Sequence, residues 1–271
     1  MRTNQLPKSW IFPTWSAPMS VRAVTTSIES LQTDDPNPFN LATHVQDELS
    51  DVEHRRAVLA KGLGLQKPIA WLDQVHGQAV TNWQKATTAQ ANHAKSGQAA
   101  IAADACITDQ RGSACVVMTA DCLPILITDK LGRQVAAVHA GWRGLQQGVI
   151  EQTLARFEAA KEQLIAWIGP AISAEHYEVD DTVRQAFEAK YPQWVEASFA
   201  WTRRGEQGDH FLFDLPQMAE HVLNLNGVHA VFQSGVCTYA EPRLFSHRAS
   251  IRLSRPVGRI ATLIWKVDGC C

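Results

Sequence analysis

The segment from Gln134 to Gly148 constrains the fold more than any other part of the chain. It starts with an apolar, strand-like run that ends at His139, continues through a turn in which glycines flank Arg143, and becomes helical from Leu145. A strand, a tight turn and a helix must therefore follow one another directly. The turn places a potential metal ligand, His139, beside a potential anion receptor, Arg143.

Apolar runs rich in β-forming residues predict a sheet in the middle of the chain and further strands on both sides. The expected strands are Val21–Thr26, Lys67–Leu72, Ala79–Trp83, Ala103–Thr108, Ala114–Met118, Ile125–Thr128, Gln134–His139, Leu164–Ile168, Val228–Gln233, Arg243–His247 and Arg259–Lys266. Helical spacing of apolar residues predicts helices within Asp47–Leu63 and at Leu145–Ala159, Asp180–Lys190 and Leu215–Leu225. The polar segments Ser27–Asn37 and Lys85–Gln98 are expected to be loops. Because helices follow only some of the strands, this order favours α+β layers over a regular βαβ winding.

The composition excludes several classes of partner. The 271 residues carry a formal net charge of −2, which is too little to attract nucleic acid or an anionic membrane surface. No apolar run approaches the roughly twenty residues of a membrane helix, and the first residues lack a signal-peptide core. We therefore expect one compact domain over residues 1–271, located in the cytoplasm, with small molecules as partners.

The cysteines are too sparse and irregular for a disulfide framework, so reduced thiols are expected. They are Cys106, Cys115, Cys122, Cys237, Cys270 and Cys271. No role is assigned to the adjacent pair at the C-terminus.

Three residues that bind soft metals lie at the edges of expected strands, namely His76, Cys122 and His139. Two imidazoles and a thiolate suit Zn²⁺ or copper rather than calcium or magnesium, and three protein ligands leave one coordination position open. Since the residues are far apart in the chain, a catalytic ion is favoured over a structural one. Such an ion could lower the pKa of bound water toward about 7 or polarise a substrate atom. Each residue also has a structural explanation, because histidines at strand ends often bond to backbone and buried cysteines often only pack.

Three neighbours of these residues have more than one interpretation. Arg143 could bind phosphate or a carboxylate in a bidentate manner, or could be a surface arginine at a helix start. Trp142 could stack on a substrate ring or pack into the core. Asp121, next to Cys122, could orient a ligand histidine, move protons or stabilise a turn.

Several motifs, in this order, resemble one known family. They are Asn40-Leu41 with His44-Val45, Asp73-Gln74-Val75-His76-Gly77, Ala120-Asp121-Cys122-Leu123-Pro124, Val138-His139-Ala140-Gly141-Trp142-Arg143-Gly144, Gly169-Pro170 and Cys237-Thr238-Tyr239. The resemblance is to the purine nucleoside phosphorylase family of the laccase-domain type, long labelled multicopper polyphenol oxidase. It extends from about Val21 to Lys266.

The resemblance implies a layered αββα sandwich with mixed sheets and Zn²⁺, or alternatively Cu²⁺, held by His76, Cys122 and His139. It implies phosphorolysis of adenosine, inosine and S-methyl-5′-thioadenosine, with adenosine deamination as a further activity, by a monomer or homodimer. Purine nucleosides and phosphate would then be the partners. The implied catalytic residues are Cys122, His139, Asp121 and Arg143, and the implied substrate-binding residues are His44, Arg143, Arg248 and Arg259.

The chain departs from the family pattern in two places. Thr26-Ser27-Ile28-Glu29 stands where the family usually has Thr-Arg before a Gly-Gly loop, so a common basic contact is absent. The segment Arg248–Arg259 is longer than the family's Arg-Arg-Asp-Gly turn and lacks its aspartate. These differences concern the substrate side rather than the metal ligands.

Other activities stay open. Multicopper sites typically contain His-x-His pairs, and none of the ten histidines forms one, so copper-dependent phenol oxidation is expected to be weak at most. A metal-free hydrolase with Cys122 as nucleophile and His139 as base is an alternative, and its substrate could be a cell-wall precursor. A non-catalytic metal or nucleoside binder is a third class.

Overall fold

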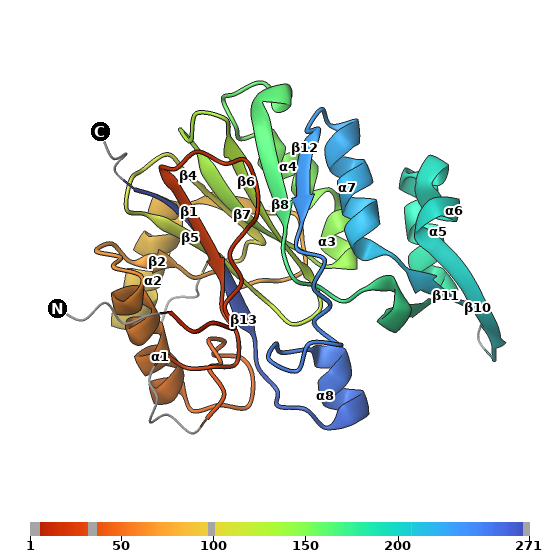
Figure 1. The fold of residues 1–271 in the computed structure, drawn as a ribbon, viewed down its shortest axis with the longest axis horizontal. Helices are drawn as coiled ribbons and strands as arrows, with labels where there is room; N and C mark the ends of the chain where they lie inside the picture. Colours follow the sequence, from red (N-terminus) through yellow and green to blue (C-terminus); the bar gives the residue numbers. More distant parts are fainter. Residues whose placement is uncertain (1–5, 32–36, 97–100, 207, 268–271) are drawn as a thin grey trace.

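Two β-sheets form the centre of the computed structural model, which describes residues 6–31, 37–96, 101–206 and 208–267 (Figure 1). The first sheet contains β3 (Val80–Asn82), β4 (Ala105–Thr108), β6 (Leu123–Asp129), β7 (Val135–Ala140), β8 (Leu164–Ile168) and β12 (Ala230–Gln233). The second contains β1 (Val21–Thr25), β2 (Ile69–Ala70), β5 (Ala114–Thr119) and β13 (Ile260–Lys266). Their strand orders are β12-β8-β6-β7-β4-β3 and β1-β13-β5-β2. Both sheets are mixed, because the pairs β3-β4, β8-β12 and β2-β5 are parallel and the other pairs antiparallel.

The two sheets pack face to face through alternate side chains of their strands. Cys115 and Val117 of β5 meet Leu126, Ala137 and Trp167 of the first sheet in one buried cluster. The other side chains of the central strands β5, β6, β7 and β8 are buried as well, since helices cover both outer faces. This burial on both faces explains why the strands appear in the sequence as continuous apolar runs.

Helix α1 (Leu49–Gly62) covers the outer face of the second sheet. Val116 and Met118, which alternate with the inward-facing residues of β5, pack with Leu59 of α1 in a separate apolar cluster. The helix therefore forms one outer layer of the sandwich.

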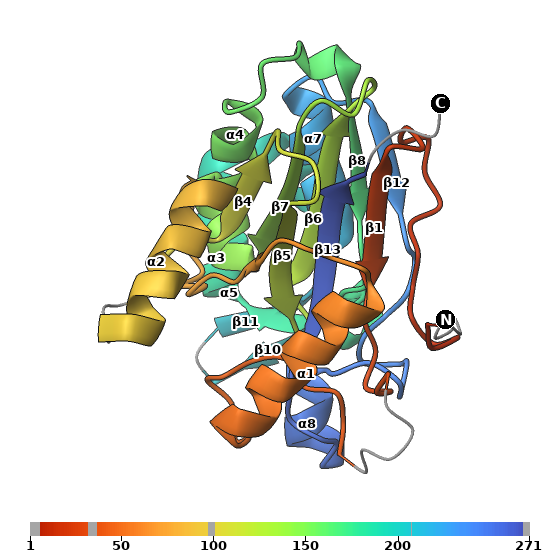
Figure 2. The same cartoon turned by 90° about the vertical axis from the view of Figure 1, so that its left-hand side faces the viewer.

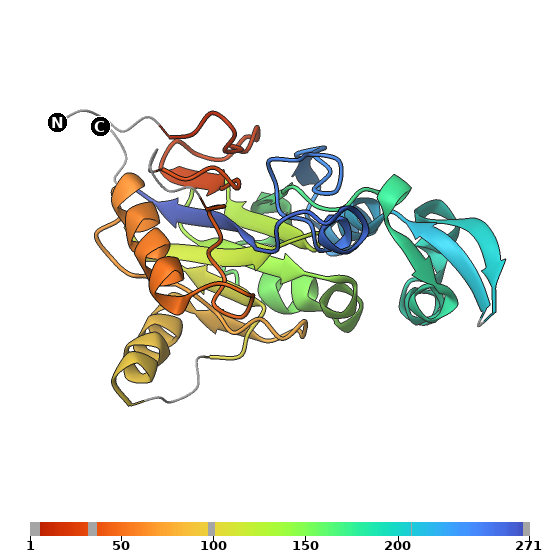
Figure 3. The ribbon, with the colours of Figure 1, turned by 90° about the horizontal axis from the view of Figure 1, so that it is seen from below.

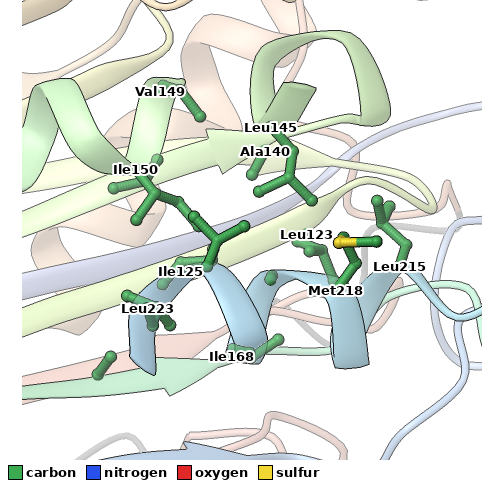
Figure 4. Close-up of a cluster of buried hydrophobic side chains, with 14 of the residues drawn as sticks. Leu123, Ile125, Ala140, Leu145, Val149, Ile150, Ile168, Leu215, Met218 and Leu223 are labelled. Atoms are coloured by element: carbon green, nitrogen blue, oxygen red, sulfur yellow. The ribbon is translucent and has the colours of Figure 1, made fainter. Parts of the chain in front are cut away.

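The opposite outer layer consists of α3 (Trp142–Gln147), α4 (Val149–Leu154) and α7 (Leu215–Leu225). Figure 4 shows side chains of these helices against Leu123, Ile125, Ala140 and Ile168 of the first sheet. The order helix, sheet, sheet, helix confirms the predicted α+β fold with αββα layers.

A small antiparallel sheet that the sequence analysis did not predict extends from one side of the molecule (Figure 3). It consists of β9 (Glu178–Asp180), β10 (Phe199–Gly205) and β11 (Gly208–Phe213), with α5 (Asp181–Lys190) and α6 (Val195–Ser198) beside it. The predicted helix at Asp180–Lys190 is confirmed, and the Asp180 carboxylate accepts a hydrogen bond from the Val183 amide at 3.3 Å as its N-cap. Short 3₁₀ segments occur at Lys161–Gln163, Ala174–His176 and Pro192–Trp194.

The loop predicted for Lys85–Gln98 is wrong, because Trp83–Ser96 forms helix α2 beside β4 (Figure 2). The Asn82 side chain accepts a hydrogen bond from the Lys85 amide at 2.9 Å, and Trp83 and Ala86 pack into the cluster between the sheets. The polar, alanine-rich composition gives little hydrophobic periodicity, so packing at the sheet edge decided this helix. Residues 97 and 98 lie outside the described part.

Two other predicted elements differ from the structure. The expected strand Arg243–His247 is a turn that leads into α8 (His247–Leu253), and the Ser246 hydroxyl caps this helix by accepting a hydrogen bond from the Ala249 amide at 3.0 Å. The expected helix Leu145–Ala159 breaks at Gly148, which has a φ of 108°, and α4 ends at Leu154.

The cysteines in the described part, Cys106, Cys115, Cys122 and Cys237, are free thiols, and Cys270 and Cys271 lie outside it. No helix among the described residues is long and apolar enough to cross a bilayer.

Candidate metal centre

Three segments bring His76, Cys122 and His139 together at one end of the sandwich. His76 lies in the turn between β2 and β3, Cys122 directly precedes β6, and His139 is on β7. In the antiparallel β6-β7 ladder, Pro124 is opposite His139, so Cys122 is held near the histidine. The ligand atoms of the three side chains lie within 4.8 Å of one another, and Cys122 Sγ is 3.9 Å from His76 Nε2. The predicted convergence is therefore present.

The turns that carry two of these residues adopt left-handed backbone conformations that side chains rarely occupy. His76 has a φ of 58° and Asp121, directly before Cys122, has a φ of 94°. Such conformations typically cost about 1–3 kcal/mol each and persist only where surrounding contacts enforce them.

The glycines of the motif around Arg143 are required by close packing. A Cβ atom at Gly141 would lie 2.9 Å from Cys122 Sγ and 3.1 Å from His76 Cδ2. A Cβ atom at Gly144 would lie 2.7 Å from the carbonyl oxygen of Gly77. The absence of both side chains allows the β7-α3 turn to pack directly on the His76 turn and on the thiol.

Asp104, which the sequence analysis did not select, is the carboxylate that contacts His139. It is fully buried, and it accepts hydrogen bonds from His139 Nδ1 at 2.8 Å, the His76 amide at 2.9 Å and the Gly77 amide at 2.7 Å. A charged residue directly before the apolar strand β4 was the signal that could have identified it, because a buried carboxylate needs partners. The carboxylate that orients His139 is therefore Asp104 rather than Asp121, whose carboxylate bonds to Thr238 and Arg248.

Asp121 instead connects three segments around the site. Its carboxylate accepts hydrogen bonds from the Thr238 hydroxyl and from the Arg248 amide, both at 2.7 Å. These contacts tie the Cys122 turn to the Thr238 loop and to the start of α8. They agree with the turn-stabilising interpretation of Asp121.

The three ligand side chains and Asp104 perturb one another electrostatically. Burial raises the pKa of the Cys122 thiol, but hydrogen bonds from His139 and His76 outweigh it and lower the pKa to about 6. Burial lowers the pKa of His139, but hydrogen bonds to Asp104 and Cys122 raise it to about 9. Burial raises the pKa of Asp104, but the hydrogen bonds from His139 and Gly77 outweigh this effect, so the pKa is lowered. Without a metal, this arrangement stabilises a thiolate beside an imidazolium.

A cavity of about 230 Å³ lies beside the three ligands. His44 and Arg259, both predicted to bind substrate, line it together with Gln74, Thr119 and His247. The pKa of His44 is lowered by burial and by the positive charge of Arg259, so its imidazole is neutral at pH 7. The Thr119 hydroxyl is buried and has no hydrogen-bond partner among the described residues. The cavity is thus lined by polar groups.

The other two predicted substrate residues, Arg143 and Arg248, line a second cavity of about 450 Å³. The exposed guanidinium of Arg143 stacks on Trp142, with 4.5 Å between Cζ and the ring centroid. Arg248 donates through both Nη atoms to the Glu178 carbonyl oxygen, at 3.2 and 3.1 Å. The structure therefore divides the predicted substrate residues between two cavities.

Tyr177, another residue missed in the sequence analysis, lines the second cavity. Burial raises the pKa of its phenol well above the usual value, and the Cys122 charge contributes to the increase. The phenol therefore stays protonated at neutral pH and can donate a hydrogen bond. The two cavities are neighbours, because His247 lines the first and the next residue, Arg248, lines the second.

Fold and site together define a class of αββα proteins that carry a cluster of two histidines and one cysteine at the end of the sandwich. Residues 21–267 match the model of the family described as multi-copper polyphenol oxidoreductase laccase. The chain belongs to this family, and the resemblance stated from its motifs is confirmed.

Relatives of similar length support this assignment. A purine nucleoside phosphorylase of Pseudomonas aeruginosa is 37% identical over 262 residues, which cover 96% of this chain and 99% of the relative. The purine nucleoside phosphorylase YfiH of Escherichia coli is 38% identical over 259 residues, covering 95% of this chain and 98% of the relative. Both alignments include nearly the whole of each protein.

Solved structures share the fold. The Neisseria meningitidis protein NMB0706 superimposes with a TM-score of 0.82 at 35% identity, covering 96% of this chain and all of the neighbour's chain. YlmD from Geobacillus stearothermophilus gives a TM-score of 0.80 at 27% identity, covering 97% and 98% of the two chains.

Proposed function

We propose that this protein is a zinc-dependent purine nucleoside phosphorylase that acts on adenosine, inosine and S-methyl-5′-thioadenosine, with adenosine deamination as a side activity. The observation that carries the proposal is the convergence of two imidazoles and a thiol beside a cavity lined by His44 and Arg259. The names of relatives that match nearly the full chain support the reaction class. A cytoplasmic monomer or homodimer with one domain is part of the same proposal.

The donor set fits zinc. Two ligands of a tetrahedral zinc ion lie about 3.5 Å apart for typical Zn–N and Zn–S bond lengths. The 3.9 Å between Cys122 Sγ and His76 Nε2 is close to this value. The lowered pKa of Cys122 also provides the thiolate that a metal needs. His76, Cys122 and His139 would hold the ion, which would supply Lewis acidity toward a substrate atom. Copper prefers the same donors and is the alternative ion.

Arg143 is assigned to the phosphate. Its guanidinium is exposed, and none of the ion pairs between described residues involves it. Two of its N–H groups could therefore hold two phosphate oxygens at once. Arg248 lines the same cavity and keeps N–H donors beyond the two that bond to the Glu178 carbonyl.

In the phosphorolysis step, a phosphate oxygen forms a bond to the ribose C1′ while the bond from C1′ to the purine nitrogen breaks. The electron pair of that bond leaves with the base, which then takes up a proton. The side chains of His44 and His247 line the ligand cavity, where both can form hydrogen bonds to the base and His247 is placed to provide this proton. The oriented arginines would stabilise the phosphate during the transfer.

The test incubates the purified protein with each nucleoside, with and without phosphate, and follows free base, pentose phosphate and inosine by chromatography. Phosphate-dependent release of adenine, together with stoichiometric zinc that is lost in Cys122→Ala, supports the proposal. Cys237→Ala is the matched control, because Cys237 is also a partly buried free thiol but lies outside the cluster. Base release that does not need phosphate would contradict phosphorolysis. Arg143→Ala should release far less base while it keeps its zinc.

A cysteine hydrolase is the second candidate. The lowered pKa of Cys122 next to the raised pKa of His139 favours it, because a thiolate beside an imidazolium is the resting state of many cysteine nucleophiles. Its substrate could be a cell-wall precursor. Activity that persists in a chelator and disappears on alkylation of Cys122 would select this function. Weak phenol oxidation with added copper would instead agree with the description of the family model.

A further inference from the structure

Asp104 contacts both segments that carry the histidines of the site. Its Oδ1 atom accepts from His139 Nδ1 at 2.8 Å and from the His76 amide at 2.9 Å, while Oδ2 accepts from the Gly77 amide at 2.7 Å. The residue is fully buried, so water does not compete for these bonds. A buried carboxylate is retained only where such partners compensate its lost hydration.

The first contact determines which nitrogen of His139 can bind a metal. An ionised carboxylate only accepts hydrogen bonds, so the proton between Asp104 and the ring resides on Nδ1. The other nitrogen, Nε2, is then the ligand atom on the side of Cys122. The main chain also fixes the position of His139 relative to Asp104, because the His139 amide donates a hydrogen bond to the Asp104 carbonyl oxygen at 2.7 Å.

The other contacts hold the His76 turn. His76 has a φ of 58°, a conformation that needs support from its surroundings. Asp104 binds two successive amides of this turn from one side, and Gly144 packs against the Gly77 carbonyl oxygen from the other. The turn is therefore clamped between the carboxylate and α3.

We propose that Asp104 is a positioning residue that fixes both histidines of the metal centre, so that metal affinity depends on a carboxylate outside the ligand set. The role rests on the proposed metal function of His76, Cys122 and His139. Carboxylates that orient ligand histidines typically change metal affinity by about 10- to 100-fold when they are replaced. Asp104 combines this effect with control of a second ligand's backbone.

Asp104→Asn tests the role because it keeps the size of the side chain and removes one acceptor. If the amide group faces His139, it donates to Nδ1 and forces the proton onto Nε2, the ligand nitrogen. If the amide group faces Gly77 instead, it places a donor against the Gly77 N–H, so that hydrogen bond is lost and the His76 turn is loosened. Either orientation weakens one of the two histidine ligands.

Asp129 provides a matched control. It is also a buried carboxylate, at the opposite end of β6 from Cys122, and it accepts hydrogen bonds at 2.9 Å from the amides of Leu131, Arg133 and Gln134. Asp129→Asn should therefore lower the free energy of unfolding without changing the metal site. Asp104→Ser is the second variant, because its smaller side chain removes the carboxylate without placing an amide N–H group against His139 or Gly77.

The experiment titrates full-length metal-free protein with Zn²⁺ in competition with a chromophoric chelator, and measures urea unfolding of each variant. Asp104→Asn and Asp104→Ser should raise the Kd for Zn²⁺ by about 10- to 100-fold, and Asp129→Asn should leave it unchanged. Equal affinity in the wild type and the Asp104 variants, or an equal loss in Asp129→Asn, would overturn the positioning role alone. A wild-type protein that binds no Zn²⁺ would overturn the metal function and this role together.

Discussion

Replacement of Gly141 by alanine is a direct test of how the metal centre is assembled. Gly141 has a φ of −68° and a ψ of 165°, which alanine adopts without strain, so the backbone itself does not resist the change. The added Cβ would lie 2.9 Å from Cys122 Sγ and 3.1 Å from His76 Cδ2, whereas ordinary contacts start at 3.4 Å. To reach an ordinary contact distance, the thiol has to retreat by about 0.5 Å and the imidazole by about 0.3 Å.

This displacement is large for a metal site. Metal–ligand distances in functional sites lie within about 0.2 Å of their ideal values. Neither side chain can move freely, because Cys122 follows Asp121 in a left-handed conformation and the His76 turn is bonded to Asp104. We expect Gly141→Ala to raise the Kd for Zn²⁺ by about 10-fold or more, and to destabilise the fold by about 1–3 kcal/mol through overpacking.

The assay is zinc competition with a chelator, combined with urea unfolding of the metal-free protein. Gly62→Ala is the matched control, because its Cβ would meet Leu31 Cδ1 at 2.8 Å, in α1 and outside the metal centre. Its zinc affinity should equal that of the wild type. If Gly141→Ala binds zinc as tightly as the wild type, the close packing of Gly141 on the ligands does not control the site.

Three further predictions concern the thiol, the core and the Asp121 contacts. In the metal-free protein, iodoacetamide should alkylate Cys122 at a rate that is near its plateau at pH 7 and falls as the pH drops below about 6. In His139→Ala the pH at half-maximal rate should move up, and an unchanged value would show that His139 does not lower the pKa of Cys122. Met218→Ala, a fully buried change in α7, should lower the free energy of unfolding by about 2–5 kcal/mol in urea titrations and leave zinc affinity unchanged; a loss below 1 kcal/mol would contradict tight packing there. Thr238→Val removes the hydroxyl that donates to Asp121 and so loosens the turn that carries Cys122. The Kd for Zn²⁺ should rise and base release should fall, and an unchanged Kd would show that the Cys122 turn does not need this contact.

Much of the sandwich could be predicted from the sequence, because a strand with two buried faces is a continuous apolar run. The segment ending at His139 and the segment Leu164–Ile168 both have this composition, and both are central strands. Helix α2 could not be predicted in this way, because its residues are mostly polar and its stability comes from Trp83 and Ala86 at the sheet edge. The small sheet of β9, β10 and β11 was missed for a related reason. Its strands are only partly buried, and β11 pairs with β9, which lies much earlier in the chain.

The candidate set of metal ligands followed from the sequence alone: soft metals prefer imidazole and thiolate donors, and the motifs around His76, Cys122 and His139 are specific. Only the tertiary structure decided which carboxylate orients His139. Asp104 and Asp121 both lie next to the end of a strand, and only the pairing of β4 with β7 brings Asp104 to the imidazole ring. The tertiary structure also decided that Arg143 and Arg259 line different cavities. Hydrogen-bond partners remote in sequence depend on how strands are aligned in the sheets, and no local pattern of residues encodes that alignment.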